Sequence, residues 1–201
     1  MSILKWLKFN DNRDNSVKPE SRPDVQNKVQ PNSKLEESTI PTFENLDEQF
    51  AYMYTQSGGK FMFFLSEQAL KVHLEKLIDE LRWQNIFTTE SQFNYLKNKS
   101  TLCSKPANTD AMISSCDGLI AFDGRIMISS NQTHQFNLSQ LPNIHIIVAT
   151  PKQITKNMSE VMRQIAVKYP NTYPSKITPI KPNKTSGRQL YVFLVEDYSY
   201  D

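Results

Sequence analysis

The chain of 201 residues has few of the residues that build disulfide frameworks, metal centres or membrane spans. Its two cysteines, Cys103 and Cys116, are too few for a disulfide framework and cannot alone hold a structural zinc or an iron–sulfur cluster. We therefore expect two reduced, buried thiols, with no metal and no other cofactor. No apolar run approaches the roughly 20 residues that cross a bilayer. These absences predict a cytoplasmic protein without a transmembrane segment.

The sequence also lacks the short motifs of several common enzyme classes. It contains no Walker loop, no dinucleotide-binding glycine motif, no nucleophile elbow and no zinc-protease helix motif. Lysine and arginine number 23 against 21 acidic residues, and the net charge of +2 is too small to favour nucleic acid as a partner. The histidines are far apart in the sequence, and we interpret His73 and His145 as structural residues.

The composition of the chain changes at about residue 43. Residues 10–42 contain no aromatic side chain, so this segment cannot bury enough apolar surface to offset its ordering entropy. We expect a flexible leader over residues 1–42 and one domain over residues 43–201. The leader starts with the amphipathic stretch ILKWLKF, which is a frayed terminus, a docking peptide for a partner or a weak membrane-surface contact.

Helix and strand patterns alternate along the domain. The apolar runs predict strands over residues 60–65, 85–89, 100–104, 143–150 and 189–197. Helical periodicity predicts helices over residues 43–57, 66–83 and 90–99, and the second of these begins at the N-cap Ser66. A long last helix is expected to start at Thr150 and Pro151 and to end at Pro170, before a proline-rich loop.

A hairpin is predicted where Asp123 and Gly124 separate the apolar runs GLIAF and RIMIS. An Asp-Gly pair in this position favours a type I′ turn, in which both residues have positive φ. We expect the hairpin to belong to the same sheet as the parallel strands. The predicted fold is therefore α/β, a three-layer α/β/α sandwich with a mostly parallel sheet and one hairpin.

Candidate site residues lie in the loops at strand ends, where open α/β sheets bind ligands. These loops offer backbone N–H groups, hydroxyls and cationic side chains to a small anionic ligand, although a helix cap, a solvated loop or a tight turn explains each of them equally well. The candidate ligand-binding residues are Gly58, Gly59, Lys60, Ser129, Ser130, Asn131, Thr150, Lys152 and Arg188. Asp123 is the candidate catalytic residue, although we interpret it first as a turn residue, and Asp110 and Asp117 are the other acids near the hairpin.

The order and spacing of several stretches resemble the lactate-utilisation protein C family, whose domain is called the LUD domain. The stretches are SGGKF, DAMISSCDGLIAFDGRIMISSNQ, LPNIHIIVATPKQI, KYPNTYPSKIT and GRQLYVFLVED, and the resemblance covers residues 46–197. It implies a fold like that of the NagB, RpiA and CoA-transferase group. It also implies a cytoplasmic role in oxidising lactate to pyruvate, beside partner proteins that carry iron–sulfur clusters.

The chain departs from the family where polar groups are expected. Family members carry sequences such as A-E-T-G-T at the hairpin, whereas residues 121–125 here are AFDGR, and the family's G-P-S-R-T-A-D-I-E segment has no counterpart. We therefore expect a divergent, non-catalytic accessory or small-ligand-binding subunit in lactate or organic-acid utilisation. Two alternatives stay open: a transferase or isomerase acting on a sugar phosphate or acyl-CoA, and a protein-interaction module.

Overall fold

Residues 41–185 and 187–198 are described in the computed structural model. The helices and strands discussed below belong to one unit of the chain, Asn45–Asp201. The expected leader over residues 1–42 lies outside the described residues except for its last two positions, so its flexibility and its amphipathic start stay predictions.

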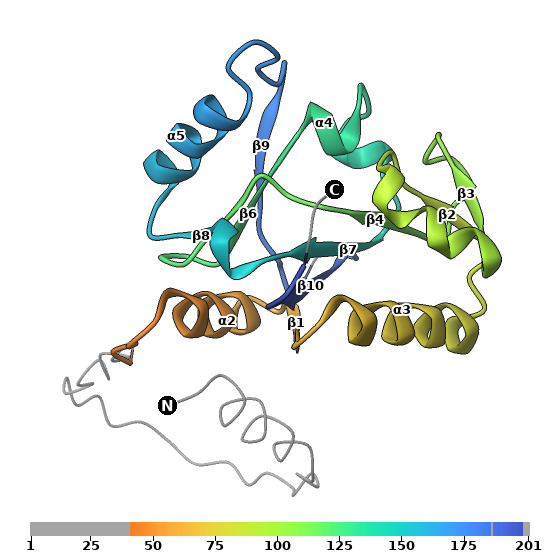
Figure 1. Ribbon diagram of the computed structural model, residues 1–201, viewed down its shortest axis with the longest axis horizontal. Helices are drawn as coiled ribbons and strands as arrows, with labels where there is room; N and C mark the ends of the chain where they lie inside the picture. The colour runs from red at the N-terminus through yellow and green to blue at the C-terminus, as the bar shows by residue number, and fades with distance from the viewer. Residues whose placement is uncertain (1–40, 186, 199–201) are drawn as a thin grey trace, which may run out of the picture. The chain divides into compact units, whose positions relative to one another are not determined.

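Six parallel strands form the main sheet, in the order β1–β10–β7–β4–β2–β3 (Figure 1). They are β1 (Lys60–Phe64), β2 (Asn85–Phe87), β3 (Thr101–Cys103), β4 (Ala111–Ser114), β7 (Ile144–Ala149) and β10 (Gln189–Val195). The central strands are apolar along almost their whole length because both of their faces are covered. This sheet confirms the α/β fold class with a mostly parallel sheet, although β4 is not among the predicted strands.

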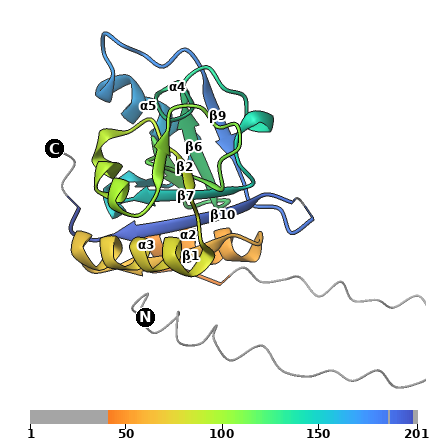
Figure 2. The same ribbon diagram turned by 90° about the vertical axis from the view of Figure 1, so that its right-hand side faces the viewer.

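Helices cover both faces of the main sheet. Helix α3 (Glu67–Leu81) and the 3-10 helix η1 (Ser91–Asn98) pack on the face that presents Ile113, Val148 and Phe193. Helix α2 (Leu46–Gln56) packs on the opposite face, where the rings of Phe50 and Phe61 lie 6.2 Å apart. Figure 1 shows α2 and α3 on the two sides of β1, and Figure 2 shows β10 between β1 and β7.

A second sheet of four strands contains the predicted hairpin. Its order is β8–β5–β6–β9, with β5 (Gly118–Ile120), β6 (Arg125–Ser129), β8 (Ile154–Thr155) and β9 (Ile177–Ile180). The expectation that the hairpin joins the main sheet is therefore wrong. The chain leaves the main sheet after β4, and the apolar side chains of the hairpin are buried instead against helix α5 (Met158–Lys168).

The turn of this hairpin also differs from the prediction. Ile120 pairs with Arg125, so residues 121–124 form the loop, and of these only Gly124 has a positive φ, of 71°. The type I′ turn is therefore wrong. The wider loop brings Gly124 against helix α2, where an added Cβ would lie 2.6 Å from the backbone nitrogen of Tyr54.

The last long helix begins at Met158 rather than at Pro151. Pro151–Gln153 forms a 3-10 turn, η3, and Ile154–Thr155 then pairs with β5 as strand β8. The Asn157 side chain caps α5 by accepting the Glu160 N–H at 3.1 Å. Strand pairing prevails over the helical pattern here because a strand buries Ile154 to the same degree that a helix would.

Two predicted loops contain regular structure. The polar segment after the hairpin forms helix α4 (Ser130–Thr133) and the 3-10 turn η2 (Leu138–Gln140). The proline-rich loop contains β9, which lies at the edge of the second sheet. An edge strand tolerates Pro179 because one side of it needs no backbone N–H donors.

Candidate functional site

The chain leaves two neighbouring strands toward opposite faces of the main sheet. Strands β2 and β4 are paired in parallel. After β2 the chain enters η1, which packs on the same face as α3, and after β4 it enters the second sheet, on the side of α2 (Figure 1). Open α/β sheets bind ligands at the carboxyl ends of strands where the connections diverge in this way.

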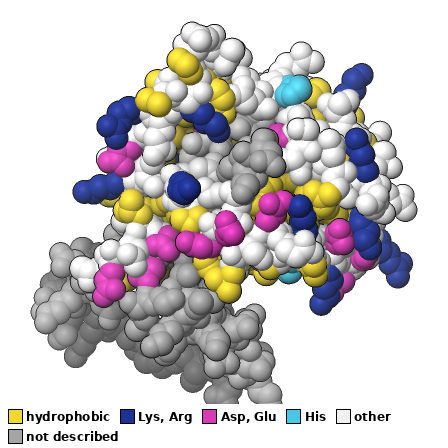
Figure 3. All heavy atoms as spheres, in the orientation of Figure 1, with side chains coloured by type: hydrophobic (Ala, Val, Ile, Leu, Met, Phe, Trp, Pro, Cys, Tyr) yellow, Lys and Arg dark blue, Asp and Glu magenta, His cyan; other side chains and the backbone are white. Residues whose placement is uncertain are grey.

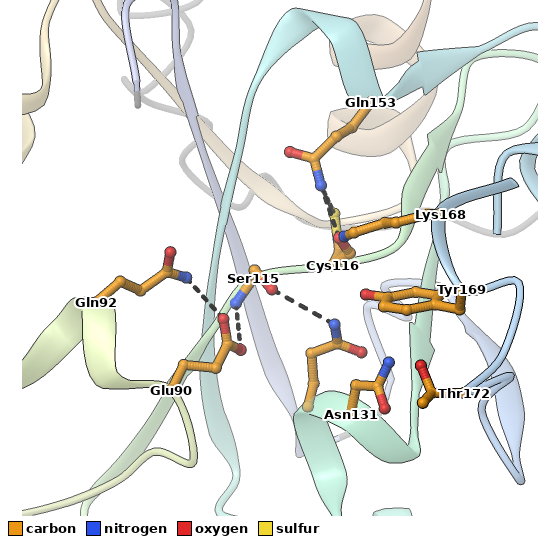
Figure 4. Close-up of a pocket in the computed structure, with 10 residues that line it drawn as sticks. Glu90, Gln92, Ser115, Cys116, Asn131, Gln153, Lys168, Tyr169 and Thr172 are labelled. Atoms are coloured by element: carbon orange, nitrogen blue, oxygen red, sulfur yellow. Dashed lines mark hydrogen bonds between the residues drawn. The ribbon is translucent and has the colours of Figure 1, made fainter. Parts of the chain in front are cut away.

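A cavity of about 500 Å³ lies at this point (Figure 4). Its walls come from the segments that follow β2, β4 and β7, from α4, and from the end of α5. The lining residues are Glu90, Gln92, Ser115, Cys116, Asn131, Gln132, Gln153, Lys168, Tyr169 and Thr172. The volume is typical of small-molecule sites.

Glu90 forms one wall of the cavity and joins the two diverging segments. Its Oε1 accepts the backbone N–H of Ser115 at 2.8 Å, and its Oε2 accepts the Gln92 amide at 2.6 Å. Burial raises the pKa of Glu90, while the Ser115 hydrogen bonds and the charge of Lys168 oppose that rise in part. These two hydrogen bonds thus fix the Glu90 carboxylate in position, and its oxygens have lone pairs left to accept a hydrogen bond from a ligand.

Lys168, Tyr169 and Asp117 form a second cluster. The Tyr169 hydroxyl donates to Asp117 Oδ1 at 3.1 Å, and the Lys168 Nζ lies 4.0 Å from the same oxygen. The Asp117 side chain is 0 % exposed, whereas that of Lys168 is 54 % exposed. Burial alone would lower the pKa of Lys168, but Tyr169 and Asp117 raise it overall, so the amine is an ammonium at neutral pH.

Two glutamine amides hold the walls in place. Gln153 Oε1 accepts the Thr150 N–H at 2.8 Å, and its Nε2 donates to the Cys116 carbonyl at 2.6 Å. Gln132 Oε1 accepts the Ser129 N–H at 2.8 Å, and its Nε2 contacts Ser115 Oγ at 3.4 Å. Both glutamines belong to capping boxes, so their amides are committed to the fold.

The thiol of Cys116 is fully buried beside the cavity. Burial raises its pKa, and the charge of Asp117 adds to the rise, so the group stays a protonated thiol and a poor nucleophile. Cys103 is half-buried rather than buried, contrary to expectation, and both cysteines are free. Among the described residues, no group of three potential ligands has the geometry of a metal site.

Residues 66–189 match the family model described as the LUD domain, which is more than half of the chain. This chain belongs to the LUD-domain family. The fold of this LUD-domain protein is similar to the crystal structure of a DUF162 family protein from Deinococcus radiodurans, with a TM-score of 0.59 and 18% sequence identity. The similarity covers 75% of this chain and 96% of that one. No curated protein matches the sequence.

Several predicted site residues of the LUD domain lie away from the cavity, where β1 and β10 begin. Gly58 and Gly59 end α2, and Gly59 packs against the ring of Tyr54. Lys60 donates to the side chains of Gln189 and Tyr191, at 2.9 and 2.6 Å. The Arg188 guanidinium donates to the carbonyls of Leu138 and Pro142, so it fastens the loop before β7. Because the cavity lies where the parallel strands end, these residues do not form one site with it.

The remaining candidates differ in their distance from the cavity. Asn131 lines it, whereas Ser129 and Thr150 act indirectly, since they cap the turns that hold Gln132 and Gln153. The other candidates do not line the cavity: Ser130 Oγ accepts the Ser175 N–H, Lys152 is exposed, Asp110 accepts the N–H groups of Gln84 and Asn85, and Asp123 pairs with Arg125.

Most of the cavity cannot be predicted from local sequence. The patterns around Glu90, Lys168 and Tyr169 predict only parts of helices or their ends, because nothing local marks these residues as facing a common space. A detectable pattern existed for the glutamines: Thr150 and Ser129 each precede a glutamine by three residues, which is the spacing of a capping box. That pattern predicts the turns but not the cavity between them.

Within the described residues, no helix is both long and apolar enough to span a membrane.

Proposed function

We propose that this LUD-domain protein binds a small carboxylic acid in the cavity between Glu90 and Lys168. In this proposal it is an accessory, non-catalytic subunit in the utilisation of lactate or a related organic acid. The observation that carries the proposal is the ammonium group of Lys168, which lines the cavity and is held by the buried Asp117 and by Tyr169. An ammonium positioned in this way can bind one carboxylate by a charge-assisted hydrogen bond.

The link to lactate rests on the family and on its resemblance to lactate-utilisation proteins. The partners proposed on that basis are iron–sulfur oxidoreductase subunits, which would perform the electron transfer. We expect these subunits to be recovered with the tagged protein from its native cells, and growth on lactate to fail after deletion of its gene. Unimpaired growth together with no recovered iron–sulfur subunit would contradict this role.

Binding itself is tested by isothermal titration calorimetry of the full chain with lactate, pyruvate and gluconate. We expect Lys168→Met to weaken carboxylate binding by about tenfold or more, because it removes the charge that faces the ligand. Lys76→Met is the matched control, since Lys76 is exposed on α3 and pairs only loosely with Glu80, at 3.6 Å. Equal affinities in the two variants would refute the site.

An isomerase that moves a proton is the second candidate, and Glu90 is the observation that favours it. A half-buried carboxylate with a raised pKa can act as a general base or acid, provided that it reaches the proton of the substrate. The test is solvent deuterium exchange into candidate substrates, followed by NMR, with Glu90→Gln as the inactive variant. The interaction-module alternative depends on ILKWLKF, which lies outside the described residues.

A further inference from the structure

The polar groups of the cavity are already committed in part, and what they leave free limits the ligand. The Tyr169 hydroxyl gives its only proton to Asp117, so its oxygen can only accept a hydrogen bond from a ligand. An ionised Glu90 can likewise only accept, because it carries no proton. The amides of Gln132 and Gln153 are bound at both ends.

The charged donor of the cavity is on the other side from Glu90. Figure 4 shows Glu90 and Lys168 on opposite sides of Ser115 and Cys116. Among the described residues that line the cavity, Lys168 is the only cation. A ligand therefore meets one positive group at one end of the cavity and, at the other end, a carboxylate that can only accept further hydrogen bonds.

We infer that the cavity selects a monocarboxylate that also carries a hydrogen-bond donor, a hydroxyl or an ammonium, and that Glu90 is the residue that recognises this donor. The inference rests on the proposed function, because it takes the carboxylate at Lys168 as given. Glu90 thereby becomes a specificity-determining residue. The ligand's carboxylate lies at Lys168, and its donor points to Glu90.

Charge excludes ligands with a second anionic group. The charge of Lys168 is already offset in part by Asp117, whose side chain is fully buried, and Glu90 adds a further negative charge. A second carboxylate or a phosphate would therefore lie near like charges without a cation of its own. The cavity of about 500 Å³ has room for more than three carbons, so a longer monocarboxylate with several hydroxyls also fits.

An oxo group in place of the hydroxyl is rejected for a different reason. A ketone oxygen can only accept, so it would face the Glu90 carboxylate acceptor to acceptor. That contact leaves the ketone oxygen without a donor and places two acceptors together, and a buried polar site discriminates strongly against such a mismatch. A hydroxy acid is thus expected to bind more tightly than the oxo acid of the same carbon skeleton.

The preference depends on the ionisation of Glu90. The charged and titratable groups that act on its carboxyl are Lys168 from α5, Cys116 and Asp117 from the segment after β4, and Tyr198 after β10. Because burial raises the pKa of Glu90, the preference is measured at about pH 8, well above the ordinary pKa of a glutamate, to favour the ionised carboxyl. At acid pH a protonated Glu90 gains a donor, and the preference for the hydroxy acid should decline.

The experiment compares lactate with pyruvate, and gluconate with 2-ketogluconate, by isothermal titration calorimetry of the full chain. We expect each hydroxy acid to bind on the order of tenfold to a hundredfold more tightly than its oxo partner. In Glu90→Gln the amide can donate to a ketone, so the two affinities should converge. Alanine tests whether an ammonium serves as the donor in place of a hydroxyl.

Glu80→Gln is the matched control, because it removes the same charge from an exposed position on α3. Circular dichroism and thermal melting establish that both variants are folded. Equal affinities of the two acids for the wild-type protein, or an unchanged preference in Glu90→Gln, would overturn the inference while leaving carboxylate binding intact. If the wild-type protein binds none of these acids, the proposed function fails, and the inference fails with it.

Discussion

The carboxylate of Glu90 accepts the backbone N–H of Ser115 at 2.8 Å, and this hydrogen bond joins the chain that leaves β2 to the chain that leaves β4. The two segments then diverge toward opposite faces of the sheet, and the cavity opens beside the bond that holds them together. The same side chain is therefore part of the framework and part of the wall that faces a ligand. Substitutions of Glu90 should accordingly affect both stability and binding.

We predict that Glu90→Ala lowers the free energy of unfolding by about 1–2 kcal/mol, because the buried Ser115 N–H loses its acceptor. Urea unfolding of the full chain provides the measurement. Glu80→Ala, on the exposed surface of α3, should change the free energy of unfolding by less than about 0.5 kcal/mol. Equal effects of the two substitutions would show that the hydrogen bond adds nothing to stability.

The raised pKa of Glu90 predicts a specific dependence of stability on pH. The folded protein binds the Glu90 proton more tightly than the unfolded chain does, for which the ordinary pKa of 4.5 applies. The contribution of this group to stability is therefore fully present below pH 4.5 and is lost as the pH rises through the folded-state pKa. We expect the difference in unfolding free energy between the wild-type protein and Glu90→Gln to shift against the wild type over that window. A flat difference would mean that burial does not perturb the group.

His145 predicts the opposite dependence. The imidazole is fully buried, its Nε2 lies 2.8 Å from Ser114 Oγ, and burial, aided by the charge of Arg188, lowers its pKa to about 3. Protonation therefore favours the unfolded chain, and this contribution to stability is lost as the pH falls from 6.5 toward 3. Unfolding measured against pH should show this loss in the wild type and in the exposed control His134→Gln, but not in His145→Gln.

The two thiols should differ in reactivity. Cys103 is half-buried, whereas Cys116 is fully buried with a raised thiol pKa. Ellman's reagent is expected to modify Cys103 in the native protein and to reach Cys116 only on unfolding. Cys103→Ser should remove the fast reaction and Cys116→Ser should leave it; rapid labelling of the Cys103→Ser protein would contradict the burial of Cys116.

Gly124→Ala should destabilise the protein by about 2 kcal/mol or more, because φ at this position is 71° and a Cβ would clash with the backbone of Tyr54 in α2. Gly187→Ala provides the control, since nothing lies within 4 Å of the Cβ position there. Chemical denaturation of both variants measures the effect. If the two substitutions cost the same, the contact between the hairpin loop and α2 does not constrain the fold.

The hairpin shows which structural features local sequence can predict and which it cannot. The apolar runs on either side of Asp123 and Gly124 predict two antiparallel strands, and those strands form as β5 and β6. The sheet that they join is not encoded in the hairpin, because an apolar strand is buried equally well in either sheet. The close approach of the loop residue Gly124 to α2 is likewise a tertiary contact that the hairpin sequence does not predict.

The segment after β7 shows the same limit for helices. Ile154 and Val161 lie on one helical stripe in the sequence, yet Ile154 is in a strand and Val161 is in α5. Both side chains are buried, as the pattern predicted. Periodicity identified the side chains that become buried but not the backbone that buries them, because pairing with β5 competes with helix formation at Ile154.

The sequence by itself determined the α/β class, the buried strands and the capped helix α3. Strand runs and helical periodicity reflect the burial of apolar side chains, and an N-cap is a hydrogen bond between residues three apart, so each is visible in a short stretch of sequence. It also carried enough of the family's spacing for the LUD resemblance to be visible. The tertiary structure alone decided the cavity, since Glu90, Ser115 and Lys168 come from different segments and meet only where the chain leaves β2 and β4 in opposite directions. No local pattern predicts that these three residues lie together, because their juxtaposition depends on the order of the strands in the sheet.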